Sequence, residues 1–291
     1  MMEIETYLEQ QGHTPQTIRS YTYHIKVFLS RNPQAQHYQY KDVVAYFNKA
    51  NDGYLNSNYR TAILAAIKRY YDFLIETGKR NDHPCRRLFL KSGMHKPRFV
   101  SNVLFSSEEL ERLLMREERY KDLKLKNQLI LSFLIFQAVT PGEIASLRMN
   151  QIDLDSGTIF LQGNRHLGSR TIDLFPRQFR LVENYLREDR PKLLRTEKHS
   201  DILILNKLGS PVQVDDINYL IETFKPLFPD RNLNAMTIRQ SVIANWLNEK
   251  RIPLEQVQLL AGHKWIGSTL VYRQKSMDEQ RELINKWHPL G

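Results

Sequence analysis

Apolar residues recur three and four positions apart through the first third of the chain, the spacing that places them on one face of a helix. In TPQTIRSYTYHIKVFLSR, Thr14 and Pro15 form a strong start signal, because a capping hydroxyl precedes a proline at the first helical position. Three other stretches share the spacing, and Gly12 and Gly78 end the first and last of them: MEIETYLEQQG, YKDVVAYFNKA and LNSNYRTAILAAIKRYYDFLIETG. The pattern predicts a small helical bundle over residues 1–83.

The second part of the chain mixes helices with one strand region. SSEELERLL predicts a helix in which Ser106 or Ser107 is the N-cap, and a long buried helix follows from about Lys124 to Val139. GTIFLQ and RTIDLF then flank the turn-rich tip GNRHLGS, which indicates a β-hairpin. Helical spacing returns afterwards, interrupted by DILILNKLGSPVQ, a short strand or extended piece. The fold class is mainly α with a small β-hairpin or sheet.

Between these parts, residues 84–105 have the composition of a linker, with two prolines, a glycine and many basic side chains. We therefore expect a helical domain over residues 1–83 and a second domain over residues 106–291.

The charge balance of the chain favours a polyanionic partner. Lys and Arg outnumber Asp and Glu by 42 to 32, giving a net charge of +10 at pH 7. Residues 1–105 contain 15 of the basic and only 8 of the acidic side chains, with a dense basic run from Lys79 to Arg98. Such a balance also serves solubility, but a basic linker between two domains is where a protein would cross a nucleic-acid backbone.

Several protein classes are disfavoured. The single Cys85 excludes an internal disulfide and fits a reducing compartment. The longest apolar run, from Leu129 to Val139, is too short to span a membrane, and the acidic N-terminus is no signal peptide. The chain has no Walker loop, no HExxH and no zinc-ligand spacing. We expect a cytoplasmic protein without a metal or nucleotide cofactor.

The order of motifs in the second part resembles that of the tyrosine recombinases, the phage-integrase and Xer-like enzymes. A buried helix leads into TPGEIASLRMNQIDL, a hairpin with a basic tip follows, and then come MTIRQSVIANWL, IPLEQVQLLAGH and STLVY. The most specific stretch runs from Ile238 to Tyr272, where His263 lies nine residues before Tyr272 as in that family. The resemblance covers nearly the whole chain, and it implies a SAM-like core-binding domain before the catalytic domain.

This resemblance implies a reaction at one DNA phosphate. Tyr272 would attack the phosphorus and form a 3′-phosphotyrosine, which conserves the bond energy for rejoining. Arg239 matches the second arginine of the family, and its planar fork suits two phosphate oxygens. His263 would bind the phosphate or assist the tyrosine, while Glu143 is the acid that commonly supports the site.

The chain departs from the family at three positions. Thr140 stands where the family has its first arginine, and Met236 where it has a histidine. The hairpin tip lacks the lysine that acts as general acid, and its nearest basic residue, Arg165, is a poor proton donor. Losing one donor to a developing oxyanion costs about 3–4 kcal/mol. The replacements open to the missing arginine are Arg148, Arg165 and Arg170, which sequence spacing alone does not place.

Three functions remain open at this point. The first is a site-specific recombinase that cuts and rejoins DNA, and retention of Tyr272, Arg239 and His263 favours it. The second is a DNA-binding accessory protein that has lost cutting, which the changes at Thr140 and Met236 favour. The third is a helical scaffold or RNA binder, which the order of five separate motifs disfavours.

Either of the first two functions requires double-stranded DNA as a partner. The residues expected to contact phosphates are Arg19, Lys26, Arg60, Lys68, Arg69, Arg86, Arg87, Lys96 and Arg98. The tyrosines of the fourth predicted helix are expected in the core rather than against bases: Tyr59, Tyr70 and Tyr71.

The amphipathic tail SMDEQRELINKWHPL would pack on a neighbouring protomer, as tails of the similar family do. The resemblance thus implies a free monomer that assembles on DNA, as a tetramer on paired sites. The sequence leaves the need for a partner recombinase open.

Overall fold

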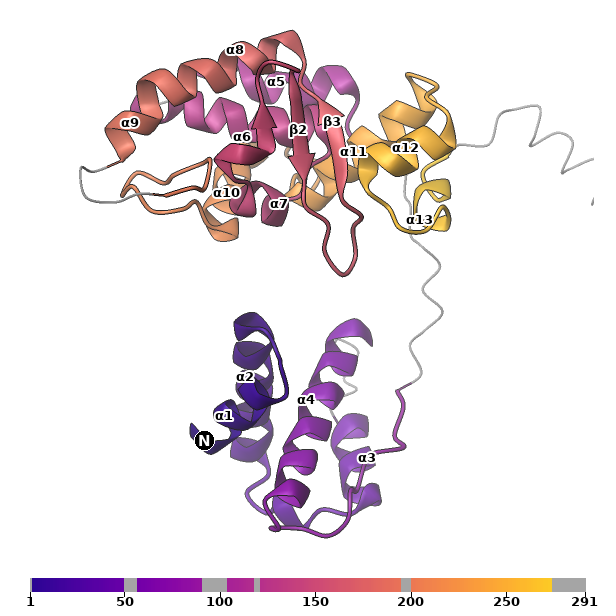
Figure 1. Cartoon of the computed structure of the whole chain (residues 1–291). Coiled ribbons are helices and arrows are strands. Elements are labelled where there is room, and N and C mark those ends of the chain that lie inside the picture. The colour runs from indigo at the N-terminus through magenta and orange to yellow at the C-terminus, as the bar shows by residue number, and fades with distance from the viewer. Residues whose placement is uncertain (1, 50–56, 91–103, 118–120, 195–199, 274–291) are drawn as a thin grey trace, which may run out of the picture. The chain divides into compact units, whose positions relative to one another are not determined.

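The computed structural model describes residues 2–49, 57–90, 104–117, 121–194 and 200–273. The chain divides into two compact units, Met1–Lys96 and Pro97–Gly291, and each is described by itself (Figure 1). Within the described residues no helix is long and apolar enough to cross a membrane.

The N-terminal unit is helical, as the apolar spacing predicts. Its elements are α1 (Met2–Gln10), α2 (Pro15–Arg31), a short 3-10 helix (Ala35–His37), α3 (Tyr40–Lys49) and α4 (Ser57–Glu76). The predicted start of α2 is confirmed, because Thr14 caps the helix by accepting a hydrogen bond from the backbone N–H of Thr17. Gly12 and Gly78 adopt positive φ angles after α1 and α4, a conformation that glycine reaches without steric cost.

Aromatic packing closes the core of this unit. Tyr71 is fully buried, and its hydroxyl donates to the carbonyl of Ala35. Tyr70 is also buried, as expected. The expectation for Tyr59 is wrong: it is 42% exposed, and its ring lies edge-on to His24 at the start of α4 rather than in the core.

In the C-terminal unit a small sheet packs against a group of helices (Figure 1). Helix α6 (Lys124–Gln137) lies at its centre, and its residues are buried on nearly every side. Ser106 caps α5, so the first of the two predicted N-caps is the observed one. The other helices are α5 (Ser107–Met115), α7 (Pro141–Ser146), α8 (Pro176–Asn184), α9 (Arg190–Leu193), α10 (Val214–Glu222), α11 (Ala235–Asn248), α12 (Leu254–Ala261) and α13 (Gly267–Leu270). Short 3-10 turns span Lys121–Leu123, Met149–Gln151 and Lys225–Leu227, and a π turn spans Tyr185–Asp189.

The sheet is antiparallel and has the order β1-β2-β3: β1 (Ile152–Asp153), β2 (Thr158–Leu161) and β3 (Arg170–Asp173). The hairpin prediction is confirmed, with Ile159 opposite Ile172 and Leu161 opposite Arg170. Side chains alternate between the faces of a strand, so Arg170 shares the buried face of β3 with Ile172. The main fold-class prediction therefore holds.

The apolar stretch after α9 forms extended backbone rather than another strand of the sheet. Its contacts are single bridges, Ile202 with Arg148 and Leu205 with Pro211. The predicted C-terminal helix lies outside the described residues.

Candidate phosphodiester site

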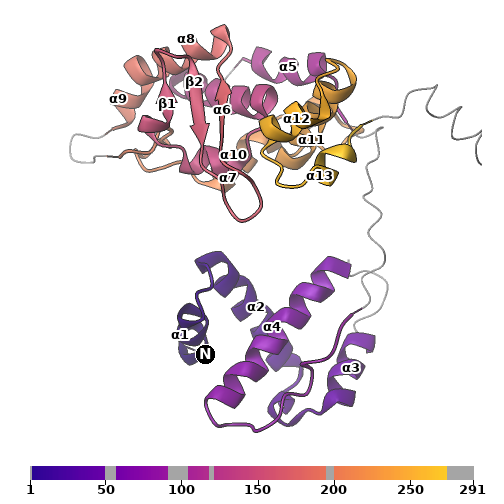
Figure 2. The same ribbon diagram turned by 45° about the vertical axis from the view of Figure 1, so that its right-hand side comes forward.

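Three turns from distant parts of the chain meet in the C-terminal unit. They are the α6–α7 turn, the β2–β3 hairpin tip and the α12–α13 turn, and both ribbon views place the hairpin tip beside α13 (Figures 1 and 2). The backbone N–H of Gly168 donates to the carbonyl of Gly262 at 2.9 Å, and Leu167 forms a bridge with His263. The sequence motifs that resemble a recombinase are thus neighbours in space.

The α6–α7 turn is built around a capping box. The hydroxyl of Thr140 accepts from the backbone N–H of Glu143, while the backbone N–H and the hydroxyl of Thr140 both donate to Glu143 Oε2 at 2.8 Å. Pro141 follows at the first helical position, as its fixed φ favours. The residue at the position of the family's first arginine is therefore a helix cap whose hydroxyl is already engaged.

The Glu143 carboxylate joins this turn to the sheet. Its Oε1 accepts a hydrogen bond from Arg170 Nη1 at 2.7 Å, and both side chains are almost fully buried. Burial alone would raise the pKa of Glu143. The hydrogen bonds and charge of Arg170, together with the bonds from Thr140, outweigh burial and hold that pKa below its usual value. Glu143 is therefore an ionised acceptor at neutral pH.

Arg239 ties the α6–α7 turn to the α12–α13 turn. It lies on α11, 7% exposed, and donates Nη1 to the carbonyl of Ala138 and Nη2 to the carbonyl of Ala261. Ala138 ends α6 in the left-handed conformation, which brings its carbonyl to this point. Burial, and then the charge of Arg170, lower the pKa of Arg239 to about 10, so the guanidinium remains charged at neutral pH.

His263 follows Gly262, which ends α12 at a φ of +69°. Its Nδ1 lies 2.8 Å from the hydroxyl of Thr269, a buried residue of α13. Burial lowers the pKa of His263 to about 4, and the charges of Arg239 and Arg170 act in the same direction. The imidazole is thus neutral at pH 7.

Tyr272 lies beyond α13, half-buried against the core of the unit. Its ring is nearly parallel to that of His263, and its backbone carbonyl accepts from Asn248 Nδ2 at 2.9 Å. Burial raises the pKa of the Tyr272 phenol, while a side-chain hydrogen bond with Gln240 and the charge of Arg239 oppose that rise. The phenol is therefore protonated at rest and lies among groups that favour its ionised form.

The hairpin tip carries two exposed basic or imidazole side chains, Arg165 and His166. An ammonium from another element lies against the same tip. Lys264 Nζ donates to the carbonyl of Asn164 at 2.8 Å and to that of Arg165 at 3.2 Å. Sequence reasoning missed Lys264, although its place directly after His263 was a usable signal. It missed Gln240 as well, because glutamine beside Arg239 suggests no chemistry by itself.

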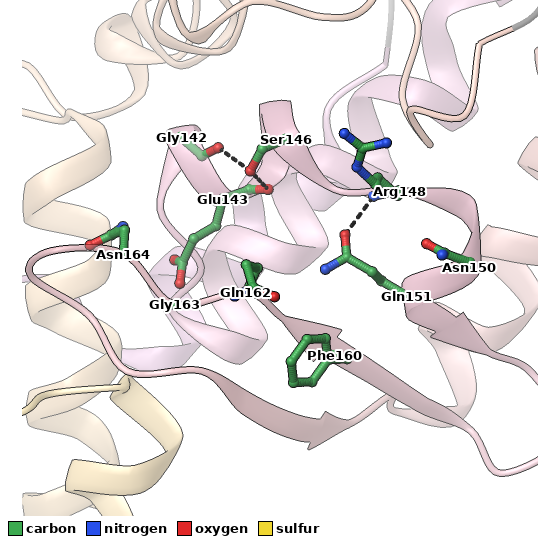
Figure 3. A pocket seen from close by; sticks show the side chains of 10 residues that line it. All are labelled: Gly142, Glu143, Ser146, Arg148, Asn150, Gln151, Phe160, Gln162, Gly163 and Asn164. Carbon is green, nitrogen blue, oxygen red and sulfur yellow. Dashed lines mark hydrogen bonds between the residues drawn. The ribbon is translucent and has the colours of Figure 1, made fainter. Parts of the chain in front are cut away.

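A hollow of about 570 Å³ opens beside Glu143, between α7 and β2 (Figure 3). Figure 3 shows Glu143 on one side of it and Arg148 with Asn150 on the other. Four amide side chains contribute to its lining: Asn150, Gln151, Gln162 and Asn164. Such groups suit hydrogen bonding to sugar, phosphate or base edges.

Two other positions considered for the site, Met236 and Arg148, are exposed on the surface. Met236 is 62% exposed in the first turn of α11, so the position where the family has a histidine presents a thioether to solvent. Arg148 is exposed, is paired with Asp201 and lies across the hollow from Glu143 (Figure 3). Among the residues that the structure describes, no three His, Cys, Asp or Glu side chains gather as a metal site.

The basic residues expected to contact DNA fall into two groups. Arg19 and Lys26 are exposed on α2, and they share one helical face with Tyr23, which is 59% exposed. Arg86 and Arg87 are exposed after α4, although Arg86 Nη2 lies 3.5 Å from Asp72. These four are accessible to a phosphate backbone.

The other basic residues of α4 make internal contacts. Arg60 is half-buried and donates to the carbonyl of Phe47 at 3.1 Å, which joins α4 to α3. Lys68 donates to the carbonyl of Arg86 at 3.0 Å, and Arg69 pairs with Asp72 at 3.3 Å. All three side chains are thus engaged within the unit. Lys96 and Arg98 lie outside the described residues.

Comparison with known proteins gives matches over both units. Residues 104–279 match the model of the phage integrase family, and residues 4–78 match the phage integrase N-terminal SAM-like domain. Tyrosine recombinase XerC of Oceanobacillus iheyensis is 26% identical over 301 residues, covering 98% of this chain and 95% of that protein. Tyrosine recombinase XerD of Listeria monocytogenes is 24% identical over 298 residues, covering 98% of both.

Solved structures share the fold. The XerH site-specific recombinase bound to its difH substrate before cleavage aligns with a TM-score of 0.65 and 19% identity, over 93% of this chain and 79% of that one. The Tn1549 transposon integrase in complex with transposon right-end DNA aligns with a TM-score of 0.66 and 12% identity, over 98% of both chains.

Proposed function

This chain belongs to the phage integrase family and is a tyrosine-type site-specific recombinase acting on DNA, and we propose that it cuts and rejoins strands through Tyr272. One observation carries this proposal. The phenol of Tyr272 lies beside the imidazole of His263, and the charges of Arg239 and Glu143 act on the same small region. These four residues come from separate elements and gather where a phosphodiester needs a nucleophile and hydrogen-bond donors.

The reaction exchanges one ester bond for another. The phenol oxygen of Tyr272 attacks the phosphorus and loses its proton, the bond from phosphorus to the 5′-oxygen breaks, and that oxygen takes up a proton. The resulting 3′-phosphotyrosine is resolved when a 5′-hydroxyl attacks it in the reverse sense. No oxidant or energy source is consumed.

Arg239 and His263 serve the phosphate in this scheme. Arg239 is charged and held rigidly by two carbonyls, which suits stabilisation of charge that develops on the non-bridging oxygens. The Nδ1 atom of His263 is paired with the hydroxyl of Thr269. In the neutral tautomer in which Nδ1 accepts from that hydroxyl, Nε2 carries the proton and donates to a phosphate oxygen.

For the leaving oxygen, the structure favours Lys264 over Arg165 as the proton donor. The family's hairpin lysine is missing, but the Lys264 ammonium lies on that hairpin tip. Two of its three protons bind carbonyls, which leaves one to give. An ammonium also releases a proton far more readily than a guanidinium does.

Double-stranded DNA recombination sites are the substrate class, since the similar XerH and Tn1549 proteins have been seen with such DNA. The exposed basic face of α2 and the amide-lined hollow are suited to contact it, and the basic segment around Lys96 and Arg98 would add phosphate contacts. We further propose a monomer that assembles on paired sites as a tetramer and works in the cytoplasm, where DNA is available. Joint action with a partner recombinase belongs to the same proposal.

A second function has its own support. Thr140 and the exposed Met236 both remove groups that the family uses at the phosphate, which favours a DNA-binding accessory protein without cutting activity. Covalent trapping separates the two functions.

The trapping experiment incubates the protein with fragmented DNA, quenches in detergent and sequences the DNA that stays attached, with Tyr272→Phe alongside. Adducts in the unmodified protein alone would support cutting through Tyr272 and reveal the site. Sequence-specific binding without adducts, with and without a partner recombinase, would favour the accessory function.

A further inference from the structure

We propose that Arg170 supplies the second guanidinium of the phosphate site, in place of the arginine that the family carries at position 140. This inference rests on the proposed function, because it concerns the same phosphate. It assigns the charge to a residue 30 positions further along the chain, on β3 rather than at the start of α7.

The contacts of Arg170 connect the three turns of the site. Its Nη1 binds Glu143, and its Nε donates to the carbonyl of Leu260 at 2.8 Å, at the end of α12. A side chain at position 262 would fill the space that Arg170 uses, since a Cβ there would lie 2.5 Å from Nη1. Gly262 thus lets the guanidinium approach the backbone that carries His263.

The third nitrogen of Arg170 has no hydrogen-bond partner in the part of the chain that the structure describes. Nη2 is fully buried, and a buried N–H without an acceptor costs about 1–3 kcal/mol. The role of a structural tie between β3, α7 and α12 accounts for Nε and Nη1 but leaves Nη2 unexplained. A phosphate oxygen would satisfy it if the side chains that cover Nη2 move aside when DNA binds, and the proposal includes that movement.

The charge of the cluster also suits one phosphate. Arg170 acts electrostatically on both His263 and Arg239, so the two guanidiniums share one region. Glu143 offsets one of them and His263 is neutral, which leaves one excess positive charge in the buried part of the site, apart from the Lys264 ammonium at the hairpin tip. A phosphodiester carries one negative charge and would neutralise the cluster.

The other arginines considered for this role fit less well. Arg148 is exposed and engaged by Asp201. Arg165 is exposed at the hairpin tip, where it lacks the fixed orientation that a transition state requires. Arg170 alone among the three is buried and held by defined contacts.

The test replaces phosphates one at a time by neutral methylphosphonates in a duplex selected from random DNA by the Tyr272→Phe protein. Binding is measured, so cleavage is not needed. Replacing one particular phosphate should weaken binding much more than replacing any other. In the Arg170→Lys variant, the loss of affinity at that phosphate should be smaller by roughly 10–100-fold, the value of a charge-assisted hydrogen bond. The other phosphates should keep their penalties. Arg187→Lys, an exposed arginine on the π turn, is the matched control.

A purely structural Arg170 would weaken binding equally at every phosphate, and that result would overturn the inference. The Thr140→Arg variant gives a second test, which leaves the buried ion pair between Arg170 and Glu143 in place. If Arg170 already binds the phosphate, Thr140→Arg in the otherwise unmodified chain should raise the loss of affinity caused by the methylphosphonate at the sensitive position by less than threefold. In the Arg170→Lys variant, Thr140→Arg should restore that loss of affinity. A tenfold rise in the intact chain would show that a guanidinium was missing there.

The two proposals fail separately. If the unmodified protein forms no covalent adduct but the position-specific effect of Arg170→Lys is present, cutting is disproved while the phosphate site stands. If adducts form at equal rates in the unmodified protein and the Arg170→Lys variant, and the scan shows no change, the inference fails while the recombinase function stands.

Discussion

The imidazole of His263 and the phenol ring of Tyr272 lie 6.4 Å apart between ring centroids, with their planes inclined by 21°. Thr269 fixes the histidine from one side, and Asn248 holds the backbone of the tyrosine from the other. The pair is therefore preorganised in the chain without DNA. The protonation states of His263 and Tyr272 then depend on the neighbouring charged side chains, which can be replaced one at a time by mutation.

The neutral state of His263 makes stability depend on pH. Its pKa in the folded chain is lowered to about 4 from an ordinary value of 6.5, so the unfolded chain binds the proton more readily. The contribution of the neutral imidazole is complete above pH 6.5, and it is lost as the pH falls towards 4. We expect urea titrations to show this loss in the unmodified protein and less of it in His263→Gln.

Because His24 and His83 also have lowered pKa values, only the difference between the two proteins reports on His263. His37→Gln, an exposed residue, is the control. Equal pH profiles for His263→Gln and the unmodified protein would contradict the neutral, buried imidazole. Adding cognate DNA should raise the pKa of His263 in an NMR titration, since a bound phosphate offsets the nearby guanidiniums.

Two glycines with the same backbone conformation offer a matched pair. Gly262 and Gly78 have φ angles of +69° and +68°, but a Cβ at Gly78 would meet nothing within 4 Å. We expect Gly78→Ala to cost about 1–2 kcal/mol from the left-handed conformation alone. Gly262→Ala should cost about 1–3 kcal/mol more, because its methyl group collides with Arg170.

Chemical denaturation of both variants measures the difference. The extra cost of Gly262→Ala should shrink when combined with Arg170→Lys, whose side chain lacks the colliding Nη1. An unchanged extra cost in the double variant would show that the collision is not with Arg170.

Lys264 is expected to protonate the leaving oxygen, and a sulfur substitution tests it. Lys264→Met should slow adduct formation by roughly 10²-fold or more on an ordinary substrate. A substrate with sulfur at the bridging 5′ position should restore the rate, because a thiolate leaves without a proton. Lys264→Arg keeps the charge but donates poorly, so it should behave like Lys264→Met if proton transfer is the role. Should Lys264→Arg retain the full rate on the oxygen substrate, Lys264 serves only as a charge or an anchor of the hairpin tip.

The sequence predicted most of the fold because local signals agree with the packing. The caps at Thr14 and Ser106 and the glycine at Gly78 lie where helices begin or end, and alternation found the hairpin. Tyr59 was misplaced because it lies in the first turn of α4, where a large aromatic ring can lie on the surface against His24. Apolar spacing does not distinguish that position from the buried ones.

The site was harder to predict, because the contacts between its turns join residues 22 to 101 positions apart. The roles of Tyr272, Arg239 and His263 came from a motif and remain predictions. The position of Arg170 depends on strand register and on the missing side chain of Gly262, which no spacing along the chain encodes. Likewise, Lys264 reaches Asn164 only because the hairpin tip folds back on α12.

The basic residues of the N-terminal unit should fall into two groups when DNA affinity is measured over a range of salt concentrations. Exposed residues should affect the salt dependence, and residues bonded within the unit should not. Lys26 is exposed beside Arg19 on α2, so Lys26→Ala should lower the slope of log affinity against log salt by about 0.9, the value of one phosphate contact on duplex DNA. Arg60 is half-buried and bonded to Phe47, so Arg60→Ala should instead lower the unfolding temperature of this unit and leave the slope unchanged once binding is corrected for the folded fraction. The two variants remove the same formal charge, which makes each the control for the other. Equal slopes for the two variants would contradict the distinction, since long-range charge alone would then explain the salt dependence.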